Sequence, residues 1–251
     1  MGRALFVILT LALGLGGCAV TPSGKVSAPL YFTEQPLHDG LTLSSDEGWW
    51  RISFSIDRPD PNRTQWPLDL LIAHQVIAPV LVAHEQHLIA WRFHRRAAND
   101  ETGHRFSFIF YAHRDIADKV YAEVQKSPML LTLKQAGRVT GDSYSDTSQI
   151  ARPLIDDTSD PSWSPEIKAA WPIYINGVSQ MWLTLIDIHA RQLAAGAQDR
   201  SLEQLEALYS RINDQITASW REEGQHALLH HLNAIFGYEP LLIHDVQEKR
   251  F

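Results

Sequence analysis

The fold is decided by the stretch "WWRISFSI", residues 49–56, in which large apolar side chains alternate with polar ones. A period of two is the period of a β-strand that buries one face against a core. The sequence therefore predicts a strand here, with Arg51 on the face that points away from the core. The predicted buried side consists of Trp50, Ile52, Phe54 and Ile56.

The same alternation recurs twice along the chain, in "LIAWRFHR", residues 88–95, and in "HRFSFIFYA", residues 104–112. The segment between them, "AANDETG", is rich in turn-forming residues, so it is predicted to connect two strands. A fourth, shorter apolar run, "MLLTLK", residues 129–134, is predicted to be the last strand.

Apolar residues at helical spacing predict helices over residues 68–87, with a break at Pro79, and over residues 114–126. The resulting order is strand, helix, strand, strand, helix, strand. Each helix is long enough to cross between parallel strands. The predicted fold class is therefore α+β, with a ferredoxin-like βαββαβ antiparallel sheet that carries both helices on one face.

The C-terminal third of the chain is predicted to form two long helices after a polar stretch. Pro165 or Pro172 suits the first turn of one helix, and Ser201 with Gln204 forms a capping box for the other. These features predict an antiparallel helical hairpin. The predicted organisation is a signal peptide (1–17), an acylated cysteine and tether (18–47), the α+β domain (48–136), a polar linker (137–163) and the helical hairpin with its tail (164–251).

The composition is that of an ordinary globular protein, with 45% apolar and 20% charged residues. A formal net charge of −7 argues against a nucleic-acid binder, which is usually basic. The chain has neither a phosphate-binding glycine loop nor a Gly-x-Ser-x-Gly motif, so nothing in these patterns indicates an NTPase or a serine hydrolase.

The single cysteine lies at the end of an apolar N-terminal run, after a short basic start. This run is too short to span a bilayer and is typical of a signal segment. The sequence Leu15-Gly16-Gly17-Cys18 resembles the lipobox of bacterial lipoproteins. That resemblance implies acylation of Cys18, palmitate among the usual chains, and stable membrane anchoring by more than one lipid chain. Ala19, in place of Asp, implies the outer membrane and a periplasmic orientation if the host is Gram-negative.

The polar face of the predicted sheet is the first candidate binding site. Arginines and a histidine on neighbouring strands would form an anion-binding group, because guanidinium forks match carboxylates and phosphates. Two alternatives stay open: a solvated face dotted with arginines, or arginines paired with acidic residues of the helical hairpin. The residues predicted on this face are Arg51, Ser53, Arg92, His94, Arg105 and Ser107.

Residues 91–110, "WRFHRRAANDETGHRFSFIF", are similar to the signature of the C-terminal domain of lantibiotic dehydratases and of stand-alone thiopeptide-maturation enzymes. The resemblance extends loosely over residues 49–135. It implies a related α+β fold with an Arg/His-lined cleft that handles an activated peptide. His104 and Arg105 match the family's His and first Arg, while Ser107 stands at its second Arg.

The second candidate site lies in "WREEGQHALLHHLNAIF", residues 220–236. Glu223, His226 and His230 share one helical face, and Glu/His pairs three residues apart recur in helix-bundle metal sites. The alternative is that the helix kinks at Gly224 and the histidines turn outward.

These observations favour a lipid-anchored envelope protein that binds rather than catalyses. No resident cofactor is expected under this hypothesis; its partners would be the membrane and either another envelope protein or an anionic peptide, lipid or glycan. The competing hypotheses are an enzyme with a divalent metal at Glu223, His226 and His230, a peptide-modifying domain, and an assembly scaffold.

Overall fold

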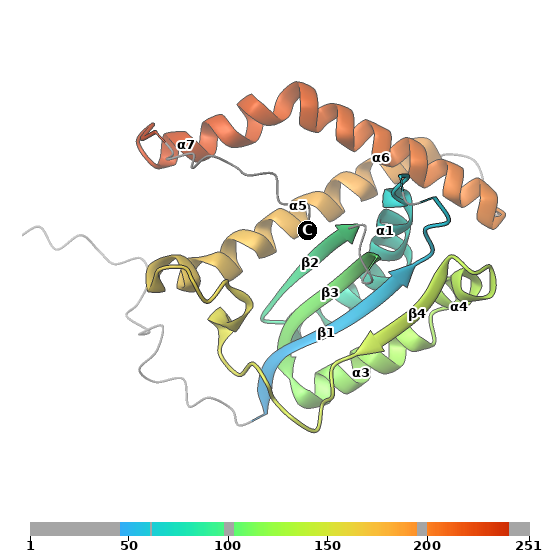
Figure 1. The fold of residues 1–251 in the computed structure, drawn as a ribbon, viewed down its shortest axis with the longest axis horizontal. Coiled ribbons are helices and arrows are strands. Elements are labelled where there is room, and N and C mark those ends of the chain that lie inside the picture. The colour runs from blue at the N-terminus through green and yellow to red at the C-terminus, as the bar shows by residue number, and fades with distance from the viewer. Residues whose placement is uncertain (1–45, 61, 98–102, 195–199, 241–251) are drawn as a thin grey trace, which may run out of the picture. The chain divides into compact units, whose positions relative to one another are not determined.

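The computed structural model describes residues 46–60, 62–97, 103–194 and 200–240. Four strands form one antiparallel sheet in the order β2-β3-β1-β4 (Figure 1). The fold class, α+β with an open antiparallel sheet and several helices, is as the sequence predicts. The strands are β1 (Glu47–Ile56), β2 (Ala90–Ala97), β3 (His104–His113) and β4 (Val139–Tyr144).

Between β1 and β2 the chain forms one helical segment whose hydrogen-bonding pattern changes along its length. Pro79 lies in the first turn of the second α-helix, directly after the π-helical stretch, and the backbone stays helical across this junction. The segment consists of α1 (Trp66–Ile72), a π-helical stretch (Ala73–Ile77), α2 (Ala78–His84) and a 3₁₀ turn (Glu85–His87).

The predicted strand at residues 129–134 is wrong, because these residues form helix α4 (Pro128–Gln135) directly after α3 (Arg114–Gln125). The hydroxyl of Ser127 accepts from the backbone N–H of Leu130, which caps the helix, and Pro128 starts it. Leu130 and Leu133, three residues apart, are both buried, as helical spacing requires. The fourth strand, β4, lies instead within residues 137–163, where the sequence predicts a polar linker.

Two long helices follow: α5 (Pro165–Ala194) and α6 (Leu202–Gly224), the latter continued by a π-helical stretch (Gln225–His230) and α7 (His231–Ile235). The capping box at Ser201 and Gln204 is confirmed by its two reciprocal hydrogen bonds. Pro172 lies inside α5 rather than at its start.

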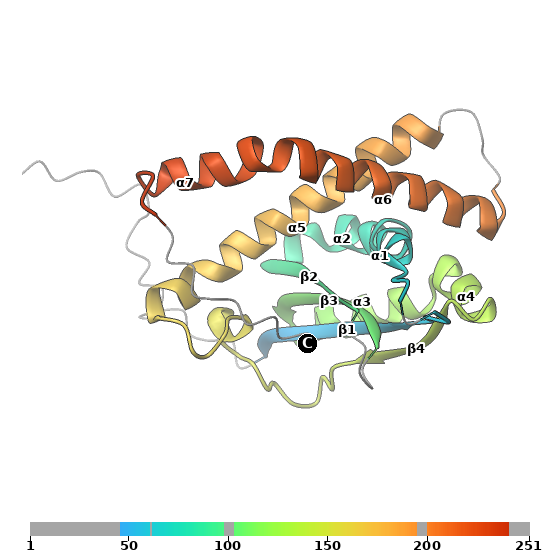
Figure 2. The same cartoon turned by 45° about the horizontal axis from the view of Figure 1, so that its top comes forward.

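Helix α5 packs along the outer edge of β2. The Asn176 side chain accepts a hydrogen bond from the N–H of Trp91 (2.9 Å), and the Ser179 hydroxyl accepts one from the N–H of Phe93 (3.1 Å). These bonds pair amide groups that an edge strand leaves open to other chains. The helical hairpin is thus joined to the sheet through its edge, and it leaves the arginine-bearing face uncovered (Figure 2).

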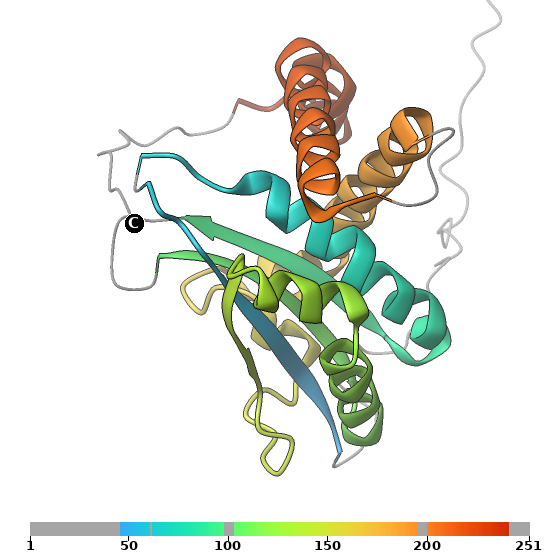
Figure 3. The same cartoon turned by 90° about the vertical axis from the view of Figure 1, so that its right-hand side faces the viewer.

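The core lies between the sheet and helices α1 to α4, which share one side of it (Figure 3). Phenylalanines of β1 and β3 are fully buried there, and Trp182 of α5 packs against Phe93 and Phe106. We call this the covered face of the sheet. Its large side chains include Phe54, Phe106, Phe108 and Phe110.

Within the described ranges, one helical segment, Trp66–His87, is long and apolar enough to cross a membrane by length and composition. It is the same segment that contributes Leu70, Leu71 and Ile77 to the core.

Candidate functional site

The other side of the sheet, which we call the open face, carries polar side chains in ordered rows. In the pairing register, Arg51 of β1 lies beside Ile109 of β3, which lies beside Arg92 of β2. The next row holds Ser53, Ser107 and His94. The rows arise because residues of the same parity share one face in each strand. The predicted grouping of Arg51, Arg92 and His94 on one face is therefore present in the structure.

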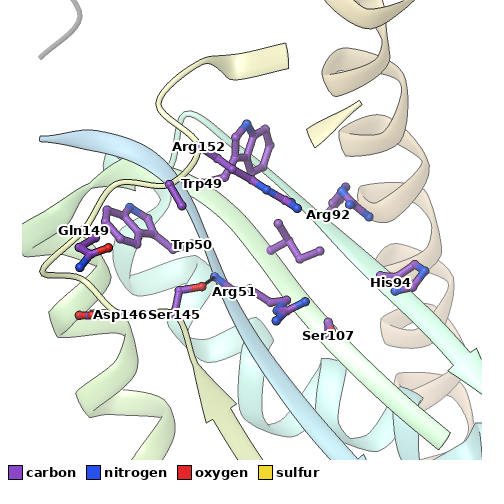
Figure 4. A pocket seen from close by; sticks show the side chains of 12 residues that line it. Trp49, Trp50, Arg51, Arg92, His94, Ser107, Ser145, Asp146, Gln149 and Arg152 are labelled. Atoms are coloured by element: carbon purple, nitrogen blue, oxygen red, sulfur yellow. Dashed lines mark hydrogen bonds between the residues drawn. The ribbon is translucent and has the colours of Figure 1, made fainter. Parts of the chain in front are cut away.

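A pocket of about 520 Å³ opens on this face (Figure 4). Arg51 and Arg92 line it from the sheet, and a third arginine, Arg152, lines it from the segment after β4. The remaining lining residues are Trp49, Trp50, His94, Ser107, Ile109, Ser145, Asp146, Gln149 and Ala151.

Hydrogen bonds from Trp49 and Tyr111 attach the segment that carries Arg152 to the sheet. The Trp49 indole N–H donates to the carbonyl of Ile155 (2.9 Å), and its backbone N–H donates to the carbonyl of Arg152 (2.9 Å). The Tyr111 hydroxyl donates to the carbonyl of Pro153 (2.6 Å). Trp49 and Tyr111 also belong to a small apolar cluster on the open face. These contacts hold Arg152 at one end of the pocket.

Arg92 has a shifted pKa. Burial, with a smaller contribution from the nearby charge of Arg152, lowers its pKa to about 10. Its Nε donates to the hydroxyl of Thr158 (2.7 Å), in the 3₁₀ turn Ile155–Thr158. A hydroxyl does not neutralise a guanidinium, so Arg92 keeps an uncompensated positive charge.

The pKa of His94 is also shifted by burial and by nearby arginines. Its pKa lies below the usual 6.5, first because of burial and then because of the charges of Arg92, Arg96 and Arg51. In the described part of the chain, no carboxylate forms an ion pair with any of the three arginines of the pocket. The one acidic lining residue, Asp146, accepts instead from the backbone N–H of Ser148 (2.8 Å). The arrangement is therefore suited to hold an anion.

The two other residues predicted for this site lie elsewhere. Arg105 is on the open face, in the row beyond Ser107, but outside the pocket lining. His104 is on the covered face with Phe106, because it has the same parity along β3. There it is fully buried, and its Nε2 lies 2.9 Å from Oδ1 of Asp69. It does not share the pocket.

Arg152 is the functional residue that the sequence interpretation missed. It lies in a segment without regular periodicity, and its place beside Arg92 depends on hydrogen bonds to Trp49, about a hundred positions earlier. No local signal identifies such a residue.

Of the predicted metal ligands, Glu223 lies near the end of α6, and His226 and His230 lie in the π-helical stretch that follows it. The rings of His226 and His230 stack with centroids 5.3 Å apart, and His231 contacts both edge-on. Within the residues that the structure describes, no group of three or more histidines and carboxylates is placed to hold a metal ion. The metal site at Glu223, His226 and His230 stays a prediction.

Cys18 and the predicted signal and tether lie outside the described residues. Comparison with protein-family models, curated proteins and solved structures finds no match to this chain. The resemblances to bacterial lipoproteins and to the C-terminal domain of lantibiotic dehydratases therefore stay predictions.

Proposed function

We propose that this protein is a lipid-anchored envelope protein that binds an anionic ligand in the open-face pocket. The observation that carries the proposal is the convergence of Arg51, Arg92 and Arg152 on one pocket without a carboxylate partner among the described residues. Anchoring through Cys18 in the outer membrane rests on the sequence motif alone.

The size and lining of the pocket support a ligand larger than a simple ion. A volume of about 520 Å³ is within the range of about 300–1,000 Å³ that small-molecule sites occupy. Trp49 and Ile109 provide apolar surface in this lining, and Ser107 and His94 provide polar groups. We infer a ligand, or the end of a longer chain, that joins an anionic group to an apolar portion.

The sheet topology supports a ferredoxin-like arrangement for the domain that carries the pocket. The order β2-β3-β1-β4 with antiparallel neighbours is the one that a βαββαβ unit adopts, with helical crossovers from β1 to β2 and from β3 to β4. We propose this topology together with a binding rather than a catalytic role.

Calorimetric titration of the purified full chain with inorganic phosphate at pH 8 tests the proposal. We expect saturable binding, weakened at least about tenfold by Arg51→Gln and by Arg92→Gln, since each removes a charge-assisted contact. The matched control is Arg211→Gln, an exposed arginine on α6, which should bind as the unsubstituted chain does. Unchanged binding in the variant with Arg51, Arg92 and Arg152 all replaced by Gln would contradict the proposal.

A further inference from the structure

The cationic lining of the open face continues beyond the pocket. Ser55 of β1, Arg105 of β3 and Arg96 of β2 form the row after the serine and histidine row. Arg105 is two residues from Ser107, which lines the pocket, so the two side chains emerge about 7 Å apart along the same face. A second guanidinium therefore lies directly beyond the pocket.

Arg105 has an unused hydrogen-bond donor. Its Nε is buried and lacks a hydrogen-bond partner. No hydrogen bond or ion pair connects its guanidinium to another residue in the described ranges. A buried donor without a partner is unfavourable unless a ligand or solvent accepts a hydrogen bond from it.

The row between the two cationic positions carries the hydroxyls of Ser53 and Ser107, with the imidazole of His94 on β2. The Ser107 hydroxyl donates to that of Ser53 (3.0 Å), and both serines are buried. These two serine side chains are small and neutral, and Ser107 is part of the pocket lining. They also place no negative charge between the two cationic positions, so a ligand chain could pass over this row.

We propose that the natural ligand is an oligoanion that carries at least two anionic groups in series, the first held by Arg51, Arg92 and Arg152 and the second by Arg105. This inference rests on the proposed anion-binding function and deepens it. A linear phosphate chain has the required chemistry, because its charged groups repeat at short intervals and match guanidinium forks.

The test compares inorganic phosphate with tripolyphosphate in calorimetric titrations of the full chain at pH 8. We expect Arg105→Gln to weaken tripolyphosphate binding about tenfold and phosphate binding less than twofold, since only the longer anion reaches the second position. Arg105→Lys keeps the charge and should restore part of the loss. Arg211→Gln is the control for net charge, and circular dichroism checks that each variant is folded.

The outcomes separate the two proposals. If phosphate binds and Arg105→Gln leaves tripolyphosphate binding unchanged, the two-position ligand is wrong and the pocket alone binds the anion. If Arg105→Gln weakens the binding of phosphate and tripolyphosphate equally, the two-position ligand is also wrong. Arg105 would then contribute to the binding of the first anionic group. If the unsubstituted chain binds neither anion, the proposed function itself fails.

Discussion

Arginines on the two faces of the sheet differ in their partners, as Arg95 and Arg92 of β2 show. On the covered face, the Arg95 Nε donates to Oδ2 of Asp69 (2.8 Å), and its guanidinium lies between the rings of Trp66 and Trp182 (4.7 and 4.9 Å). On the open face, Arg92 reaches only the hydroxyl of Thr158. The same residue type thus stabilises the fold on one face and remains available to a ligand on the other.

The role of each arginine is therefore determined by the partner that it contacts. Asp69 is fully buried and bonds both Arg95 and His104, so charge and hydrogen-bonding capacity are satisfied within the protein. The open face has no equivalent of Asp69 within the described residues. There the pKa of Arg92 is lowered, first by burial and then by the nearby charge of Arg152. This contrast leads to four testable predictions.

The largest loss of stability is expected for the Asp69→Ala variant. Removal of the carboxylate leaves Arg95 without its counter-ion and His104 without its acceptor, which should lower the free energy of unfolding by about 3 kcal/mol or more. Urea unfolding measures the loss. Asp214→Ala, at an exposed position of α6, is the control and should change stability by less than about 0.5 kcal/mol. A small effect at Asp69 would mean that the covered face does not depend on this cluster.

The direct comparison of the two faces is Arg95→Gln against Arg51→Gln. The first loses a charge-assisted hydrogen bond and two cation–π contacts, so we expect a loss of about 2 kcal/mol in unfolding free energy. The second replaces an exposed arginine and should change stability by less than about 0.5 kcal/mol. Equal losses would show that both arginines serve the fold.

A substitution at the outer edge of β2 is expected to cause a smaller loss of stability. Asn176→Leu removes the acceptor for the N–H of Trp91, and we expect a loss of about 1–2 kcal/mol, because the backbone donor is left unpaired under α5. Gln180→Leu, at an exposed position on the same helix, is the matched control in chemical denaturation. If the two variants lose equal amounts of unfolding free energy, the hydrogen bond to Asn176 does not stabilise the edge of β2.

The smallest effect is the pH dependence of anion binding. Burial and the surrounding arginines hold the pKa of His94 below 6.5, so the free protein carries it neutral at pH 7. A bound anion favours the protonated ring and raises that pKa; binding therefore takes up a proton and tightens as the pH falls. Hydrogen bonds from Ser148 lower the pKa of Asp146, which stays charged throughout this range.

We expect sulfate, whose charge is constant between about pH 5 and 8, to bind about threefold more tightly at the lower pH. His94→Gln should remove this dependence and leave binding at pH 8 unchanged. Affinity that falls with decreasing pH would contradict the proposed electrostatics of the pocket.

Much of the open face follows from local sequence, because alternate residues of a strand lie on opposite faces. That rule places Arg51, Arg92 and His94 together. It also separates His104 from Arg105, although the family resemblance grouped them as neighbours in one motif. The structure follows the parity of the strand: His104 lies with Asp69, and Arg105 lies beyond Ser107.

The last strand could not be predicted in the same way. Residues 129–134 are an apolar run too short to distinguish a helix from a strand by periodicity. The true fourth strand, "VTGDSY", buries only Val139 at the sheet edge and so has no apolar alternation to reveal it. Its pairing depends on the length of β1, which is distant in sequence.

Local sequence encodes three of the four strands, the faces on which their side chains lie, and the capping box of α6, because each of these depends on neighbours within a few residues. Packing between distant segments selects which arginines acquire a carboxylate and which line a pocket. Asp69 meets Arg95 across 26 positions, and Trp49 holds the segment of Arg152 through a bond across 106 positions. Contacts at such separations depend on the packing of the whole chain, and no local pattern encodes them.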